Sequence, residues 1–404
     1  MYEITISGEN NDFPYYNRGE IRIQKKEQIK MKRIIFIVLL ILLVTLGLTG
    51  EALKKQFNVE PGKKLDIDLK SGGSINISGW EKKEMAVTVR FKNGNAGDWD
   101  ISFDKTQQGI KIEARFKGKK HKHHGSPAFE IRVPNRFDLK LKTMGGGITI
   151  DHVEGEITGK TMGGGLNLSH LKGSIDLKTM GGEIVLKDSD IDGKVKTMGG
   201  RVLLENVVGD VSGSSMGGNV IYKNVKSRSG KSDGKVVSIS TMGGAINVSD
   251  ASHGAKVKTM GGNIHVKSAE EFIKATTMGG NITIDSIDGW VKATTMGGDI
   301  KVTMTGDPAK GKRDVYLSSM GGDITLAVPS GLSMDIHIEL CYTKSSRKDY
   351  KIVSDFKIQQ EEKDDWHKGK GSHKKCIYGK AKIKDAKHKI KIKTINGNVY
   401  LKEN

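Results

Sequence analysis

The sequence predicts an all-β protein: a right-handed parallel β-helix, or β-solenoid, with 18-residue rungs and a β-rich cap at each end. The tripeptide Met-Gly-Gly occurs ten times between Met144 and Met320, and seven of the nine steps between copies are 18 residues long. Two apolar residues in alternation follow each copy, which is typical of a strand with one buried face. A fixed period near 20 residues indicates stacked structural units rather than a globule with one central core.

The chain begins with segments that precede the predicted fold. Residues 34–48 form an apolar run without charge, preceded by Lys32 and Arg33. A basic start, a short apolar core and small residues after it predict that residues 31–52 are a secretory signal or a membrane anchor. Signals rarely start thirty residues into a chain, so we interpret residues 1–30 as a misassigned upstream extension, with translation starting at Met31.

An open stack of parallel strands exposes unpaired backbone groups at its ends and needs caps. We expect residues 53–141 to form the N-terminal β cap, in which Ser71–Ile77 resembles a degenerate rung. Residues 327–404 are expected to form the C-terminal β cap. Its last segment is again a degenerate rung, in which Ile395-Asn396-Gly397 replaces Met-Gly-Gly. Cys341 and Cys376, the only cysteines, are compatible with one disulfide or with two unpaired buried thiols.

The repeat body, residues 142–326, is predicted to place equivalent strands of successive rungs in parallel, about 4.8 Å apart. In each rung the strand before Met-Gly-Gly and the strand after it disagree on which residue points inward. A bend at Gly-Gly resolves the conflict, because glycine reaches positive φ without steric penalty. We expect the methionines to stack inside as a flexible apolar column, with the preceding Thr hydroxyls as a ladder beside them. A second corner is expected at lone glycines such as Gly155 and Gly173.

Two rungs carry basic inserts, at 226–234 and 306–313. Inserts in repeat proteins project as loops, often on a binding face, although a tolerated surface loop is the simpler explanation of both.

The internal K-T-M-G-G units and the terminal K-T-I-N-G-N-V-Y-L, residues 393–401, resemble the repeats of the bacterial DUF4097 family of candidate adhesins. The resemblance covers roughly residues 60–404 and implies a β-solenoid behind a signal peptide. It implies no catalytic residues.

The chain has 66 Lys and Arg against 47 Asp and Glu, a net charge of +19. Anionic polysaccharide, nucleic acid and anionic membrane are all admissible partners of such a chain. The lysines are spread along the whole length and no nucleic-acid motif is present, so no specific nucleic-acid partner is expected. A solvated, self-repelling surface is the simpler interpretation of the charge.

Two columns of polar residues are the candidate ligand-binding sites. The first holds lysines at the same place in four successive rungs: Lys142, Lys160, Lys178 and Lys196. They suit an anionic polymer, or they only prevent edge-to-edge association. The second follows Gly-Gly and includes Asn263, Asn281, Asp299 and Asp323. It suits a sugar, or it is a turn-stabilising Asx ladder. His121, His123 and His124, and also His367 and His373, lie in Lys-rich stretches where exposed charged loops explain them better than a metal site does.

No catalytic, cofactor-binding or metal-binding residues are predicted. The function expected is that of a non-enzymatic, exported adhesin or cell-envelope structural protein that binds a polymer or cell-surface ligand through many weak contacts. Its location would be periplasmic, cell-surface or extracellular, with membrane attachment only through residues 34–48. Two alternatives stay open: a polysaccharide-processing enzyme on the same scaffold, and a self-assembling envelope scaffold whose rods associate end to end.

Overall fold

The computed structural model describes residues 52–404 except 92–94, 119–124, 227–236, 344–348 and 368–373, and Ala52–Asn404 form one compact unit. The described residues contain 31 strands in one continuous sheet and a single 3-10 turn, η1, at Ala96–Asp98. The predicted all-β class is confirmed. No described helix has the length and apolar character needed to cross a lipid bilayer. The predicted extension and export signal lie outside the described residues.

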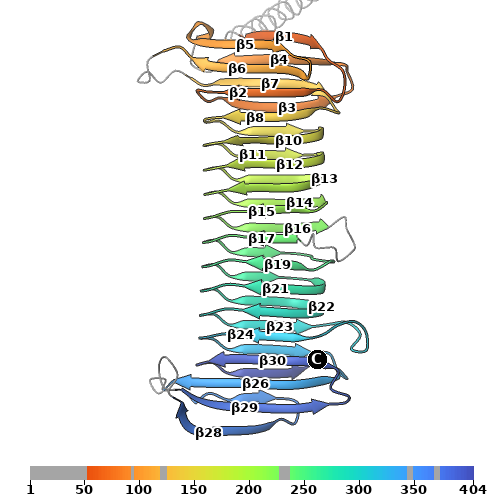
Figure 1. Cartoon of the computed structure of the whole chain (residues 1–404), viewed down its shortest axis with the longest axis vertical. Coiled ribbons are helices and arrows are strands. Elements are labelled where there is room, and N and C mark those ends of the chain that lie inside the picture. The colour runs from red at the N-terminus through yellow and green to blue at the C-terminus, as the bar shows by residue number, and fades with distance from the viewer. Residues whose placement is uncertain (1–51, 92–94, 119–124, 227–236, 344–348, 368–373) are drawn as a thin grey trace, which may run out of the picture. The chain divides into compact units, whose positions relative to one another are not determined.

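The strands fall into three groups along the chain (Figure 1). The N-terminal group is β1 (Ala52–Asn58), β2 (Lys64–Leu69), β3 (Ser74–Trp80), β4 (Glu84–Phe91), β5 (Trp99–Lys105), β6 (Gly109–Phe116) and β7 (Pro127–Pro134). The first half of the repeat is β8 (Asp138–Thr143), β9 (Ile148–Asp151), β10 (Glu154–Thr161), β11 (Leu166–Ser169), β12 (Lys172–Thr179), β13 (Ile184–Thr197), β14 (Val202–Val208), β15 (Val211–Ser214) and β16 (Val220–Lys226).

The second half of the repeat is β17 (Val237–Ser240), β18 (Ile246–Val248), β19 (Ala255–Lys258), β20 (Ile264–Val266), β21 (Ala269–Thr276), β22 (Ile282–Thr294), β23 (Ile300–Met304), β24 (Val315–Ser318) and β25 (Ile324–Val328). The C-terminal group is β26 (Met334–Thr343), β27 (Ile352–Ser354), β28 (Gln359–His367), β29 (Lys374–Ile383), β30 (His388–Ile395) and β31 (Val399–Glu403).

Strands of the repeat pair in parallel with the equivalent strands of the neighbouring rung. Leu166 pairs with Ile184, and Ile184 with Val202, each 18 residues further along. The parallel pairing continues across both inserts, since Val220 pairs with Ile246 across the longer one and Ile300 with Ile324 across the shorter one. The handedness of the turns stays a prediction.

At both ends of the stack, a strand far away in the sequence lies between the repeat and an outer strand. At the N-terminal end, β2 pairs on one side with β6 and on the other with β8, all in parallel. At the C-terminal end, β30 pairs with β24 and with β26 in the same way, as Figure 1 shows. The segments predicted as degenerate rungs therefore lie enclosed, by parallel pairing, between the repeat and outer strands. Antiparallel strands β4 and β29 extend the outer rungs, and a Cys341–Cys376 disulfide joins β26 to β29.

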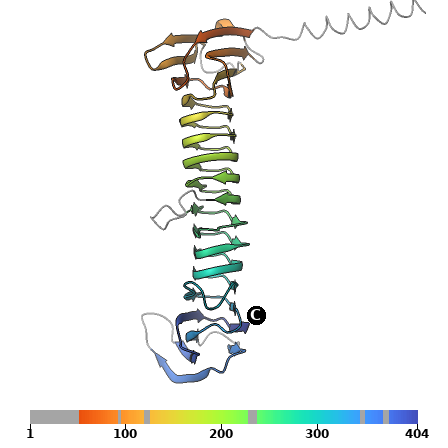
Figure 2. The ribbon, with the colours of Figure 1, turned by 90° about the vertical axis from the view of Figure 1, so that its right-hand side faces the viewer.

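A continuous aliphatic core runs through the stack. Figure 2 shows the strands of successive rungs stacked along the long axis of this unit. Ile148, the first apolar residue after Met-Gly-Gly, is fully buried, and so are its equivalents in later rungs such as Ile184 and Val220. Similar aliphatic side chains at rung spacing pack against one another, so each rung buries only a narrow strip and depends on both neighbours. This arrangement explains how a chain with 36% hydrophobic residues builds a long core.

At the Thr-Met step of each rung, the methionine points to solvent rather than into the core, which is opposite to the prediction. The methionines lie outside, with exposed fractions between 38% for Met216 and 57% for Met144. The preceding Thr or Ser residues are buried. The predicted internal methionine column is therefore wrong, and the predicted hydroxyl ladder is confirmed. The physical reason is that the buried hydroxyl satisfies backbone groups of the turn that a thioether could not.

The glycines of the turn are needed for close approach rather than for positive φ. Of the second glycines of the Met-Gly-Gly copies, only Gly146 has a positive φ, 54°. A Cβ added at Gly182, Gly200 or Gly262 would instead fall well inside 3.0 Å of the backbone of the preceding rung. The turn backbones of successive rungs therefore stack in direct contact.

The second corner is partly as predicted. The lone glycines Gly173, Gly193 and Gly209 have positive φ, of 108°, 125° and 132°, although Gly155 and Gly193 lie inside strands β10 and β13. Polar residues a few positions earlier, which the prediction did not include, also have positive φ: 56° at His152, 52° at His170 and 47° at Asp188. Asn and Asp tolerate the left-handed region because their side chains bond locally, and Asn206 Nδ2 donates to Asp188 Oδ1 of the preceding rung at 2.9 Å.

Replacing Thr197 by valine tests the hydroxyl ladder. Thr197 Oγ1 donates to the Gly182 carbonyl at 2.8 Å and accepts from the Gly200 amide at 3.2 Å, and the residue is fully buried. Valine leaves both backbone groups unsatisfied, so we expect a loss of about 1–3 kcal/mol in the free energy of unfolding. Thr197→Ser is the control, because Ser215 and Ser319 fill the same position. Equal losses for the two variants in denaturant unfolding would contradict the role given to the hydroxyl.

Candidate functional site

The most extensive polar feature of the stack is a lysine face, formed by outward-pointing residues of the strands that precede Met-Gly-Gly. Strand residues two apart point to the same side, so two neighbouring columns of lysines run along it. The first column contains Lys142, Lys160, Lys178, Lys196, Lys258 and Lys393. The second contains Lys140, Lys194, Lys256, Lys274, Lys292 and Lys391.

The four lysines predicted as a column are direct neighbours in the ladder. Lys160 pairs in register with Lys142 and with Lys178, and Lys178 pairs with Lys196. Neighbouring strands are about 4.8 Å apart, at which two unit charges in water repel by about 0.9 kcal/mol before salt screening. The predicted placement is confirmed, and ligand binding by these residues stays a prediction.

Carboxylates pair with four of the twelve lysines of the lysine face. Asp176 lies 3.4 Å from Lys178 Nζ and 3.2 Å from Lys194 Nζ. Lys140 Nζ lies 2.8 Å from Asp66, and Lys393 Nζ lies 2.6 Å from Glu339. Among residues that the structure describes, Lys160, Lys196 and Lys258 have no carboxylate within ion-pair distance. The lysine face therefore keeps an excess of positive charge.

The second predicted column forms a ladder of side-chain to backbone hydrogen bonds. Asn263 Oδ1 accepts from the Asn281 amide at 2.9 Å, and Asn281 Oδ1 accepts from Asp299 at 2.9 Å. The Asp299 carboxylate accepts from the Asp323 amide at 2.8 Å, so the two carboxylates lie in adjacent rungs as predicted. Each side chain therefore already bonds the next rung, which is the Asx-ladder arrangement.

An open groove of about 700 Å³ lies near the N-terminal end, on strands β1, β4, β7, β3 and β9. Trp80 lines it, with Lys82 Nζ 5.1 Å and the Arg132 guanidinium 5.6 Å from the ring centre. Glu130 and Asp151 also border it. A stacked aromatic ring between charged groups can bind a polar ligand with an apolar face.

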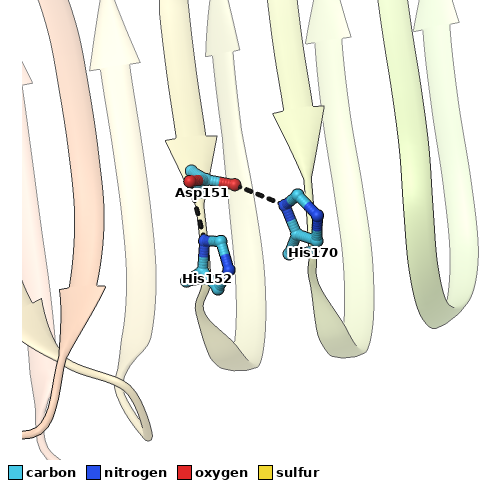
Figure 3. A group of neighbouring side chains, drawn as sticks. All are labelled: Asp151, His152 and His170. Atoms are coloured by element: carbon cyan, nitrogen blue, oxygen red, sulfur yellow. Dashed lines mark hydrogen bonds and ion pairs between the residues drawn. The ribbon is translucent and has the colours of Figure 1, made fainter.

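A cluster that the sequence did not reveal lies beside this groove, at the left-handed corner (Figure 3). Asp151 Oδ2 lies 2.7 Å from His152 Nδ1, and Asp151 Oδ1 lies 2.8 Å from His170 Nδ1. The two rings stack with centroids 4.3 Å apart. One ligand atom from each residue lies within 4.8 Å of the others, so the three could hold one divalent ion. The signal for it was the 18-residue spacing of the histidines, which places them in adjacent rungs.

The hydrogen bonds of this cluster lower the pKa of Asp151. Burial alone would raise the pKa of the Asp151 carboxyl, but hydrogen bonds from His170, Ser169 and His152 outweigh it and lower the pKa to about 2 from 3.8. A carboxyl whose pKa is lower in the folded state stabilises the fold above its unfolded pKa, about 4, and loses that contribution as the pH falls towards 2.

We expect a His152→Ala/His170→Ala variant to raise the pKa of Asp151 towards its ordinary value, measured by NMR titration of the carboxyl carbon. His265→Ala is the control, because His265 pairs with Asp285 at 2.7 Å elsewhere in the stack. A pKa of Asp151 that stays near 2 in the double variant would contradict the assignment.

Most of the remaining sequence candidates lie outside the part of the chain that the structure describes. His121, His123, His124 and His373 lie outside the described residues, as does the side chain of His367. The insert at 226–234 is described only at its first residue. The insert at 306–313 is described, and its Arg313 is buried rather than presented to a ligand.

Comparisons with known proteins give distant structural neighbours only. No family model matches the chain, and no curated protein matches it. A solved candidate adhesin from Parabacteroides distasonis has 14% identity and a TM-score of 0.40, covering 63% of this chain and 98% of its own. A candidate adhesin from Parabacteroides merdae has 17% identity and a TM-score of 0.36, covering 64% and 97%. A candidate lipid-binding protein from P. distasonis has 12% identity and a TM-score of 0.31, covering 64% and 98%.

Proposed function

We propose that the protein is an exported, non-enzymatic β-solenoid of the adhesin type, similar to the DUF4097 proteins, whose lysine face binds a linear anionic polymer of the cell envelope or cell surface. Parallel pairing at an 18-residue offset supports the solenoid, and parallel crossovers are right-handed almost without exception. The observation that carries the binding role is the pair of lysine columns.

The lysine columns suit a polymer better than a small ligand. Charges repeat about every 4.8 Å through Lys142, Lys160, Lys178 and Lys196, before Ser214 and Ser240 interrupt the column. A chain with regularly spaced carboxylates or sulfates can therefore contact several lysines at once. Each contact is weak in water, but contacts on one polymer add up because all after the first are intramolecular. Neutralising the face also relieves the repulsion between neighbouring lysines.

The binding test uses polygalacturonate, a linear polymer with one carboxylate per sugar, and measures its affinity for the full chain as a function of salt. The variant Lys160→Gln/Lys178→Gln/Lys196→Gln removes three neighbours from the first column. We expect at least a tenfold loss of affinity. We also expect the slope of log affinity against log salt concentration to become shallower by roughly 0.7 for each lost contact, if counterion release is like that of single-stranded nucleic acid.

The matched control, Lys223→Gln/Lys267→Gln/Lys301→Gln, removes the same charge from exposed residues on another side of the rung. It should change the affinity less than twofold. Equal losses in the two variants, or equally tight binding of neutral dextran, would contradict the proposal. New reducing ends appearing during incubation would favour the polysaccharide-processing alternative instead.

A further inference from the structure

A ridge of exposed methionines runs along the corner of the stack, separate from the lysine face. It consists of Met144, Met162, Met180, Met198, Met216, Met242, Met260, Met278, Met296 and Met320, which are ten of the twelve exposed large hydrophobic residues in the described part of the chain. Backbone bonds hold the ridge in register: the Met260 amide donates to the Met242 carbonyl at 3.1 Å, and the Met278 amide to Met260 at 3.1 Å. The longer insert does not interrupt the ridge, since the Met242 amide donates to Met216 at 3.2 Å.

The fold does not require methionine at this corner. At the N-terminal end, Leu69 pairs with Thr143, so Lys70 occupies the position equivalent to a ridge methionine. At the C-terminal end, Ser318 pairs with Lys393, so Ile395 occupies that position two residues later. The buried Thr and the closely stacked Gly make the turn, and the side chain between them points to solvent. Methionine at ten successive rungs therefore has a reason other than packing.

The ridge is too narrow to be a general apolar docking surface. The residue two positions before each methionine is polar in many rungs, as with Lys160 and Lys178, and the two that follow are glycines. Outside the ridge, Val208 and Val353 are the only exposed large hydrophobic residues among those described. What the ridge offers that a row of leucines would not is a line of thioether sulfurs.

Thioethers are soft, uncharged ligands that select soft metal ions such as copper(I). Bonds from sulfur to a bound metal are about 2.3 Å long, as in zinc sites, so one ion between two sulfurs needs a separation of about 4.6 Å at most. Adjacent rungs are about 4.8 Å apart, and methionine has three rotatable bonds with which to adjust. Exposure leaves these bonds free to turn.

We propose that the methionine ridge binds soft monovalent cations, copper(I) or silver(I), between thioethers of adjacent rungs. Ten thioethers taken two at a time give about five ions per chain. Both cysteines are in the disulfide, so no free thiol among the described residues competes for the ions. Binding involves no change of oxidation state.

The test is a titration of the full chain with silver(I) nitrate in halide-free buffer, with bound metal measured after desalting. The alternating variant replaces every second ridge methionine by leucine, at Met162, Met198, Met242, Met278 and Met320. The block variant replaces the same number consecutively, at Met242, Met260, Met278, Met296 and Met320. Leucine keeps the volume and apolar character, so only sulfur and adjacency change.

We expect the block variant to keep about half of the bound silver and the alternating variant to lose nearly all of it, with at least a tenfold lower apparent affinity. A chain with all ten methionines replaced defines the background from histidines, and circular dichroism verifies that each variant is folded. Equal retention in the two variants, or no silver bound above that background, overturns the proposal. Competition with a copper(I) chelator then gives the affinity for copper(I).

Discussion

Replacing Gly262 by alanine is expected to destabilise the stack by at least about 3 kcal/mol, because the new methyl group cannot be placed without moving backbone. A Cβ at Gly262 would fall well inside 3.0 Å of the Gly244 carbonyl oxygen of the preceding rung. Backbone stacked on backbone has no flexible side chain that could turn away. The rung must therefore separate from its neighbour, and the hydrogen bonds of the corner weaken with it.

Gly261→Ala is the matched control, one residue earlier in the same turn. Its Cβ would lie 3.6 Å from the nearest atom, the Gly243 carbonyl oxygen, which is ordinary contact. We expect a change below about 1 kcal/mol, since alanine also restricts the unfolded chain. Hydrogen exchange at the turns around residues 242–264 would measure both effects locally. If the two variants exchange alike, the close stacking of the second glycine is not what shapes the corner.

Removing the Arg313 side chain has the second-largest expected effect. Arg313 is 1% exposed, and its guanidinium donates to the Thr305 carbonyl at 2.6 Å, to the Lys310 carbonyl at 3.0 Å and to the Asp288 carboxylate at 2.6 Å. These bonds tie the 306–313 insert to the preceding rung. Arg313→Met removes all three hydrogen bonds of a buried guanidinium, and we expect a loss of about 3 kcal/mol. This is at the low end for a broken buried ion pair, because Asp288 is half exposed.

Arg201→Met is the control for charge alone. Arg201 pairs with Glu183 at 3.2 Å, but both side chains are about half exposed. Exposed pairs contribute little, so the loss should stay below about 1 kcal/mol. Denaturant unfolding compares the two variants, and proteolysis within 306–313 reports on the loop. An Arg313 variant as stable as the Arg201 variant would show that the insert does not need its anchor.

The parts of the fold set by periodicity were predictable from the sequence. The 18-residue step gave the register, so the position of Lys160 between Lys142 and Lys178 followed from counting alone. The same count would have brought His152 and His170 together, had the histidines been compared across rungs. Equivalent positions in a repeat are neighbours in space, whatever the detailed shape of the rung.

The orientation of single residues at the corners was not predictable in the same way. Alternation assigns Thr197 and Met198 to opposite sides, but it does not say which side is which where two strands meet out of phase. The buried hydroxyl decides the matter through hydrogen bonds between rungs, which no local pattern reveals. The strand order at the two ends of the stack was also not predicted. At the C-terminal end, β30 pairs with both β24 and β26, and these pairings join segments far apart in the sequence.

The last strand bears on what happens when the chain is pulled by its termini. A strand at the free edge of a stack can be peeled off one ladder at a time. β31 pairs with both β25 and β27, whereas β1, the first described strand, pairs among the described strands with β4 alone. Tension on the C-terminal strand must therefore detach it from two partners together, and unravelling under load is expected to begin at β1.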